Sequence, residues 1–198
     1  MDHRILTINT RIPPRSPGLV SRARLVDAIE AGLDDANVVL ISAPAGYGKT
    51  TLLIDWAHTT QRNVAWLTVE PGQNDPALLL RYLLTAWNAV DPEVGKTTAG
   101  LMLESMEPDA DLTARVLVNY AARASISVTF ALDELHLIEN PAAGSLLTSL
   151  IEHLPPEFKF VATYRSEPGL PLSRWRARGR LYELGGAELA FRIEETRQ

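Results

Sequence analysis

Short runs of apolar residues recur along the chain, and stretches with helical spacing of apolar positions lie between them. The first run, residues 38–42, is continuously apolar and rich in β-branched side chains. Such a run is typical of a strand that is buried on both faces of a parallel sheet. Similar runs and a short last segment predict the other strands, so that the expected strands cover residues 38–42, 64–69, 127–132, 158–163 and 181–184.

Amphipathic segments predict the helices between these strands. The strongest begins at Asp75-Pro76, where an acidic cap precedes a proline in the first turn. Its apolar stripe is Leu79, Leu83 and Trp87. Ser21 is expected to cap an earlier helix. Helices are thus expected at about 22–32, at 50–60, from 76 onward, at 111–124 and at 141–154, with mostly loop over 91–110.

Strands that alternate with helices indicate right-handed βαβ units and a sheet covered on both faces. The sequence therefore predicts an α/β fold of three layers, with a parallel sheet of about five strands. The length of 198 residues fits a single domain. Residues 1–20 are expected to be an extended lead-in, residues 21–190 the domain, and residues 191–198 the start of a following helix.

Composition narrows the functional classes. The chain has no cysteine, which excludes thiol nucleophiles, thiolate metal sites and disulfides. The net charge of −5 argues against direct binding of DNA by the chain as a whole. No apolar run approaches the roughly 18 residues of a membrane span, and the first residues lack a signal-peptide apolar region. We expect a cytoplasmic protein with no membrane contact.

A glycine-containing segment between the first strand and its helix carries the clearest chemistry. Residues 43–50 read Ala-Pro-Ala-Gly-Tyr-Gly-Lys-Thr, which matches the Walker A phosphate-loop pattern except for Ala43 at the first position. Such a loop points backbone N–H groups at phosphate oxygens, and the following helix adds its positive end. The expected nucleotide contacts are Ala45, Gly46, Tyr47, Gly48, Lys49, Thr50 and Thr51.

Three of these side chains have separate expected roles. Lys49 supplies positive charge to the β- and γ-phosphates, Thr50 is an expected Mg²⁺ ligand, and Thr51 can bond the α-phosphate. The alternative is an ordinary glycine-rich turn with a surface lysine. The position between a buried strand and a helix argues against that alternative, as does the rarity of lysine, which occurs three times in the chain.

A second acidic element follows the apolar run 128–132. Asp133 at the strand tip can hold Mg²⁺ against Thr50, as in a Walker B strand. Glu134 could then orient and deprotonate an attacking water. The alternative is that Asp133 caps the next turn while Glu134 is solvated. Arg165, after the next strand, could reach the γ-phosphate or could be a surface arginine.

Together these residues resemble the nucleotide-binding domain of large ATP-binding LuxR-type transcriptional regulators of the maltose-regulon-activator kind, which belong to the STAND class of P-loop ATPases. The order and spacing of the matching segments extend over nearly the whole chain. The resemblance is carried by residues 42–52, 65–67, 132–138, 165–172 and 178–181.

The resemblance implies a P-loop NTPase core of the ASCE type, with an additional strand between the Walker A and Walker B strands. It also implies that Glu134 is the catalytic base, that Arg165 is the sensor arginine, and that Val20 and Arg22 belong to an adenine-contacting motif. The implied cofactors are ATP or ADP with Mg²⁺.

The function predicted from this resemblance is an ATP/ADP switch with weak, slow Mg²⁺-dependent ATP hydrolysis. Relatives of this kind carry a winged-helix segment, helical repeats and a helix-turn-helix that the 198 residues lack, and ATP-dependent self-association is a further expectation. Two alternatives stay open. One is a P-loop kinase that phosphorylates a small molecule or a nucleotide, and the other is a non-catalytic scaffold that holds ADP.

Two further features have plain interpretations. Four arginines lie within residues 174–180 beside Trp175, and we expect a solvated or domain-docking surface there rather than a nucleic-acid site. The four histidines lack metal-ligand spacing, and His136 is expected to pack after the acidic strand.

Overall fold

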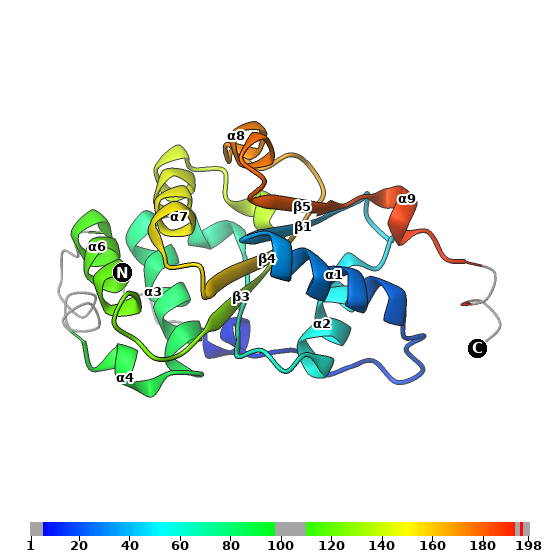
Figure 1. The fold of residues 1–198 in the computed structure, drawn as a ribbon, viewed down its shortest axis with the longest axis horizontal. Coiled ribbons are helices and arrows are strands. Elements are labelled where there is room, and N and C mark those ends of the chain that lie inside the picture. The colour runs from blue at the N-terminus through cyan, green and yellow to red at the C-terminus, as the bar shows by residue number, and fades with distance from the viewer. Residues whose placement is uncertain (1–5, 98–109, 193–194, 196–198) are drawn as a thin grey trace.

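The computed structural model describes residues 6–97, 110–192 and 195. Its centre is one parallel sheet with the strand order β2-β3-β4-β1-β5 (Figure 1). The predicted parallel sheet is confirmed, and each strand end lies within one residue of its expected position. The strands are β1 (Val38–Ser42), β2 (Val64–Thr68), β3 (Val128–Asp133), β4 (Phe158–Tyr164) and β5 (Leu181–Leu184).

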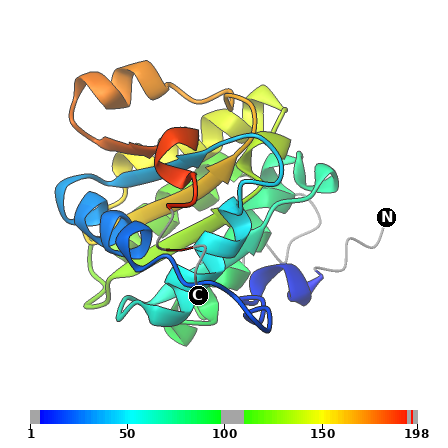
Figure 2. The same cartoon turned by 90° about the vertical axis from the view of Figure 1, so that its right-hand side faces the viewer.

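Helices cover both faces of this sheet. On one face lie α1 (Ala23–Asp35) and α2 (Lys49–Thr59), which Figure 2 shows in front of the strands. The other face is covered by α3 (Pro76–Asn88), α6 (Ala110–Ala121) and α7 (Pro141–His153) (Figure 1). The three-layer α/β fold is therefore confirmed.

Alternation along β1 shows why its apolar run is continuous. Val38 and Leu40 pack into the cluster under α3 and α7, whereas Val39 and Ile41 pack into the cluster under α1 and α2. Successive side chains of a strand point to opposite faces, so a strand with two covered faces needs apolar residues at every position.

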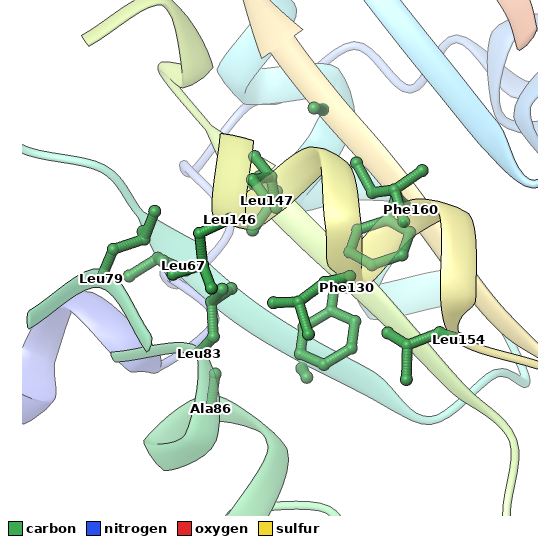
Figure 3. Packing of buried hydrophobic residues seen from close by; sticks show 14 of the residues in the cluster. Leu67, Leu79, Leu83, Ala86, Phe130, Leu146, Leu147, Leu154 and Phe160 are labelled. Atoms are coloured by element: carbon green, nitrogen blue, oxygen red, sulfur yellow. The ribbon is translucent and has the colours of Figure 1, made fainter. Parts of the chain in front are cut away.

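The larger cluster lies between the sheet and α3, α6 and α7, and Figure 3 shows the part of it that involves α3 and α7. The rings of Phe130 and Phe160 stack across neighbouring strands, with centroids 5.2 Å apart and an interplanar angle of 15°. Trp87 meets Phe130 edge-on at 5.9 Å. Burial of each such side chain contributes about 1.5–3 kcal/mol to the free energy of folding. Packing of these rings therefore helps to hold β3 and β4 side by side.

The helix cap predicted from the sequence is present at α3 and absent at α1. The Asp75 side chain accepts a hydrogen bond from the Leu78 N–H at 2.9 Å, which confirms the predicted cap. The prediction that Ser21 caps the next helix is wrong, because no side chain caps α1. The Ser21 hydroxyl instead donates to the buried carboxylate of Asp55 at 2.9 Å, and a hydrogen bond to a charged acceptor is stronger than a cap bond accepted from a neutral backbone N–H.

Several short elements differ from the predicted loops, because segments this short carry no readable periodicity. The lead-in expected to be extended contains a 3₁₀ turn, and the expected loop 91–110 contains a short helix; residues 98–109 of that loop lie outside the described residues. These elements are η1 (Thr7–Thr10), η2 (Pro71–Gln73), α4 (Pro92–Gly95), η3 (Leu135–Leu137), α8 (Leu172–Ala177) and α9 (Gly186–Leu189).

The C-terminal helix expected over 191–198 lies largely outside the described residues, which there are 191, 192 and 195. Within the part of the chain that the structure describes, no helix combines the length and apolar character needed to cross a membrane.

Candidate functional site

The phosphate loop connects β1 to α2 at the carboxyl edge of the sheet. Gly46 and Gly48 have φ angles of +86° and +73°, a region that residues with a Cβ rarely adopt. Gly48 occupies the position before the first residue of α2, and no side chain caps this helix. The first N–H groups of a helix lack intrahelical partners, so this end of α2 suits an anion.

Lys49 lies inside the loop and is not a surface residue, with 5% of its area exposed. Its ammonium donates to the carbonyl oxygens of Ala43 and Pro44, at 2.8 and 3.0 Å. Burial lowers the pKa of Lys49, and the nearby negative charge of Glu134 opposes that shift. The loop therefore holds a positive charge at its centre, whereas Ala45 and Tyr47 lie at its exposed turn.

Asp133 joins the phosphate loop to β4. Its Oδ1 accepts hydrogen bonds from the Thr50 hydroxyl at 3.0 Å and from the Thr163 hydroxyl at 2.6 Å. The carboxylate is buried, and burial raises the pKa of Asp133 while the two hydroxyl bonds act in the opposite direction. Asp133 therefore does not cap the following turn, and the structure brings it to Thr50 as the sequence predicted.

Thr163 is the residue at this site that sequence reasoning missed. Its hydroxyl donates to Asp133 and accepts from the Glu134 N–H at 3.0 Å, so it positions both acidic residues. The available signal was a threonine near the end of an otherwise apolar strand. That signal is weak, because threonine is common in strands.

Glu134 is held in a strained conformation between two basic side chains. Its φ of 60° makes it the only non-glycine residue with positive φ among those described. Such strain concentrates at functional sites. Its carboxylate accepts from Arg165 Nη2 at 3.2 Å, and the other oxygen lies 3.5 Å from His136 Nε2. The structure thus pairs the two residues expected to be the base and the sensor arginine.

The oxygens near the phosphate loop fit Mg²⁺. Thr50 and Asp133 place a hydroxyl and a carboxylate side by side, and Mg²⁺ is usually held by one or two protein oxygens together with water and phosphate. A cage of three or more acidic or histidine ligands is absent from the described residues. The donor set therefore suits an ion that arrives with a nucleotide.

A cavity of about 240 Å³ lies beyond the phosphate loop, against the first turns of α2. It brings the predicted adenine-contacting residues Val20 and Arg22 next to Thr51. Arg22 is buried, and its guanidinium donates to the carbonyls of Gly48 at 3.0 Å and Leu189 at 2.8 Å. The remaining wall includes Gly18, Leu19, Gly46, Leu52, Asp55 and Phe191.

A larger cavity of about 460 Å³ lies between the η3 turn, the start of α7 and residues 166–170. No residue of the phosphate loop lines it, so its position does not suit the phosphates of a nucleotide.

Curated proteins of one kind are similar in sequence to almost the whole chain. Over 187 residues, 94% of this chain, it is 29% identical to the HTH-type transcriptional regulator MalT of Cronobacter sakazakii and to that of Klebsiella pneumoniae. The chain is a homologue of MalT-type regulators. It spans 20% of the length of these relatives. No protein-family model matches it.

Solved structures support the fold of this MalT-type homologue. One chain of the Drosophila ORC bound to AT-rich DNA and Cdc6 matches with a TM-score of 0.56 and 14% identity, over 89% of this chain and 57% of that one. The Walker-type ATPase of Pyrococcus abyssi matches with a TM-score of 0.54 and 15% identity, over 78% and 48%. These likenesses confirm the P-loop ATPase fold.

Strand pairing confirms the subtype that the resemblance implied. β4 pairs with β1, which precedes the phosphate loop, and with β3, which ends in Asp133. The additional strand therefore lies between the Walker A and Walker B strands and brings Thr163 and Arg165 to the site.

Proposed function

We propose that this chain is the ATP/ADP-binding switch domain of a longer MalT-type transcriptional regulator and that it hydrolyses ATP slowly with Mg²⁺. The observation that carries the proposal is the arrangement of Lys49 inside the phosphate loop beside the bonded pair Thr50 and Asp133. The MalT homology over 94% of the chain supports the regulatory context.

The phosphate loop and the start of α2 bind the phosphates of the nucleotide. The backbone N–H groups of residues 45–48 surround the phosphates, Lys49 neutralises the β- and γ-phosphates, and Thr51 bonds the α-phosphate. The base extends into the neighbouring cavity beside Val20 and Arg22. Thr50 and Asp133 would hold Mg²⁺, which when bound offsets the negative charge of the phosphate oxygens.

Hydrolysis assigns distinct roles to the ion-paired residues. Glu134 takes a proton from water, whose oxygen bonds to the γ-phosphorus while the bond to the β–γ bridging oxygen breaks, giving ADP and phosphate. Arg165 contacts the γ-phosphate. Arg165 pairs with Glu134, so a triphosphate that takes up the arginine would release the carboxylate of the base.

The output belongs to the longer protein. ATP and ADP would favour different arrangements of the segments that follow this domain, and the ATP form would self-associate. The chain itself contacts nucleotide and neighbouring domains, in the cytoplasm, and DNA would be bound by a helix-turn-helix elsewhere in the regulator.

Calorimetry with ATP and ADP tests the proposal. Lys49→Ala should weaken binding at least about a hundredfold, since it removes a charge-assisted contact from inside the loop. Lys96→Ala is the control, because Lys96 is exposed and pairs with Glu93. Glu134→Gln should retain ATP binding and stop phosphate release. Unchanged affinity in Lys49→Ala contradicts the nucleotide site, and transfer of labelled phosphate to an acceptor other than water favours a kinase.

A further inference from the structure

The far wall of the 240 Å³ cavity comes from a segment that the sheet does not hold in place. Residues 11–22 precede α1 and have no helical or strand structure. They nevertheless supply Gly18, Leu19 and Val20 to the cavity. Within the segment, the structure gives one backbone bond, from the Leu19 N–H to the Ser16 carbonyl at 3.3 Å. Contacts with side chains of other elements must therefore fix this wall.

Asp55 on α2 provides the central contact. Its Oδ1 accepts from Arg15 Nη2 at 2.5 Å and its Oδ2 accepts from the Ser21 hydroxyl at 2.9 Å. Arg15 also donates to the backbone carbonyl of Asp55 at 3.1 Å. The two ends of the loop 15–21 are thus fastened to one carboxylate, and the cavity-lining residues lie between them.

Burial makes this contact costly to lose. Asp55 is 2% exposed, and a buried carboxylate is tolerated only when its oxygens are paired. Removing one partner of such a pair is strongly unfavourable, because the other charge is left without compensation. The position of the loop is therefore coupled to the identity of residue 55.

Asp55 also lies on the face of α2 that lines the cavity. It follows Thr51 by four residues, so both side chains lie on one face of α2, and both line the cavity. The phosphate-loop contacts of Lys49 and Thr50 involve other partners, namely Ala43, Pro44 and Asp133. The contacts that hold Lys49 and Thr50 thus do not involve Asp55, and the base end meets the phosphate loop through the bond from Arg22 to the Gly48 carbonyl.

We propose that Asp55 is a positioning residue for the base of the bound nucleotide. It clamps the loop 15–21 against α2, so that Leu19 and Val20 form an apolar wall for a flat heterocyclic base. Both carboxylate oxygens are occupied, so Asp55 acts through the loop and does not itself contact the base. The inference rests on the proposed nucleotide-binding function and adds the residue that shapes the base end.

Hydrogen exchange and calorimetry on the whole chain test this proposal, with Asp55→Asn as the variant. Amide exchange in residues 16–22 should become about tenfold faster, and ADP affinity should fall about tenfold. Affinity for inorganic tripolyphosphate with Mg²⁺, which has no base, should stay within about twofold of the wild type. Glu30→Gln is the matched control. Glu30 also accepts bonds from α2 and its C-terminal end, through Trp56, Thr60 and Arg62, but does not line the cavity.

Three results would overturn the inference. The first is unchanged exchange and ADP affinity in Asp55→Asn, and the second is an equal loss of ADP and tripolyphosphate binding. The third is a wild-type chain that binds no ADP, which removes the proposed function as well. If Asp55→Asn shows no cooperative melting, Arg15→Gln replaces it, because the Arg15 side chain is 41% exposed, a glutamine amide can still donate to Asp55, and the bond from Ser21 remains. This variant should speed exchange in residues 16–22 about threefold, and unchanged exchange would contradict the proposal.

Discussion

At the scale of single residues, Asp133 shows how burial and hydrogen bonding oppose each other. Asp133 is 3% exposed, and its Oδ1 accepts hydrogen bonds from the Thr50 and Thr163 hydroxyls. Burial raises the pKa of Asp133 above its value in the unfolded chain. The folded state therefore binds this proton more readily, and the associated stability is present at low pH and lost as pH rises through the folded pKa.

Asp133→Asn should therefore stabilise the nucleotide-free protein at pH 8. The amide oxygen can still accept both hydroxyl bonds, while the costly buried charge disappears, and we expect a gain of about 1 kcal/mol in the free energy of unfolding. Urea unfolding at pH 5 and pH 8 measures this gain and should show a flatter pH dependence. Asp34→Asn is the control, since the Asp34 side chain is 73% exposed. Lower stability of Asp133→Asn at pH 8 would contradict this account.

At the scale of elements, Asn74 connects the segment after β2 to the segment after β3. Its amide nitrogen donates to the carbonyls of Pro71 at 2.8 Å and Leu137 at 3.0 Å. Its amide oxygen accepts from the N–H groups of Glu139 at 2.7 Å and Asn140 at 3.1 Å. One side chain thus fixes η2 against the turn that follows Glu134.

Asn74→Ala should loosen the turn that carries Glu134. We expect a loss of about 1–3 kcal/mol in stability, because four exposed or half-buried backbone groups lose their partners at once. Phosphate release should slow while ADP affinity is retained. The matched control is the neighbouring Asp75→Ala, which removes only the cap of α3 and should cost about 1 kcal/mol without changing phosphate release. Equal phosphate release by the two variants would show that Asn74 does not position Glu134.

The elements also show what the sequence alone could predict. Apolar runs located β1 to β4, because burial on both faces leaves a pattern that local residues reveal, whereas β5 is an edge strand with two exposed residues. The Walker patterns located Lys49, Thr50 and Asp133 because each motif is a contiguous stretch of sequence. The partners of Ser21 and Thr163 could not be predicted, because Asp55 and Asp133 are 34 and 30 residues away. Such contacts depend on strand order, which the local sequence does not encode.

At the scale of the whole molecule, the segment after β5 returns to the nucleotide site. Arg24 on α1 donates to the carbonyls of Glu188 at 2.7 Å and Ala190 at 2.8 Å, and pairs with Glu195 at 2.9 Å. The ring of Phe191 lies 4.9 Å from the Arg22 guanidinium and lines the base-end cavity. The chain therefore leaves the sheet along a path that the nucleotide would touch.

Arg24→Gln should release this segment without damaging the sheet. Amide exchange in residues 186–192 should become about tenfold faster, and ADP, which contacts Phe191 in the proposed complex, should restore part of the protection by mass action. The control is Arg176→Gln, because Arg176 pairs with Glu183 on the exposed side of β5 and touches no part of the cavity. If ADP does not change amide exchange in residues 186–192 of the wild type, this segment is not coupled to the nucleotide site. Protection by ADP would mean that occupancy of the cavity is transmitted to residues 186–192, and this is the physical requirement for a nucleotide to act on the segments that follow.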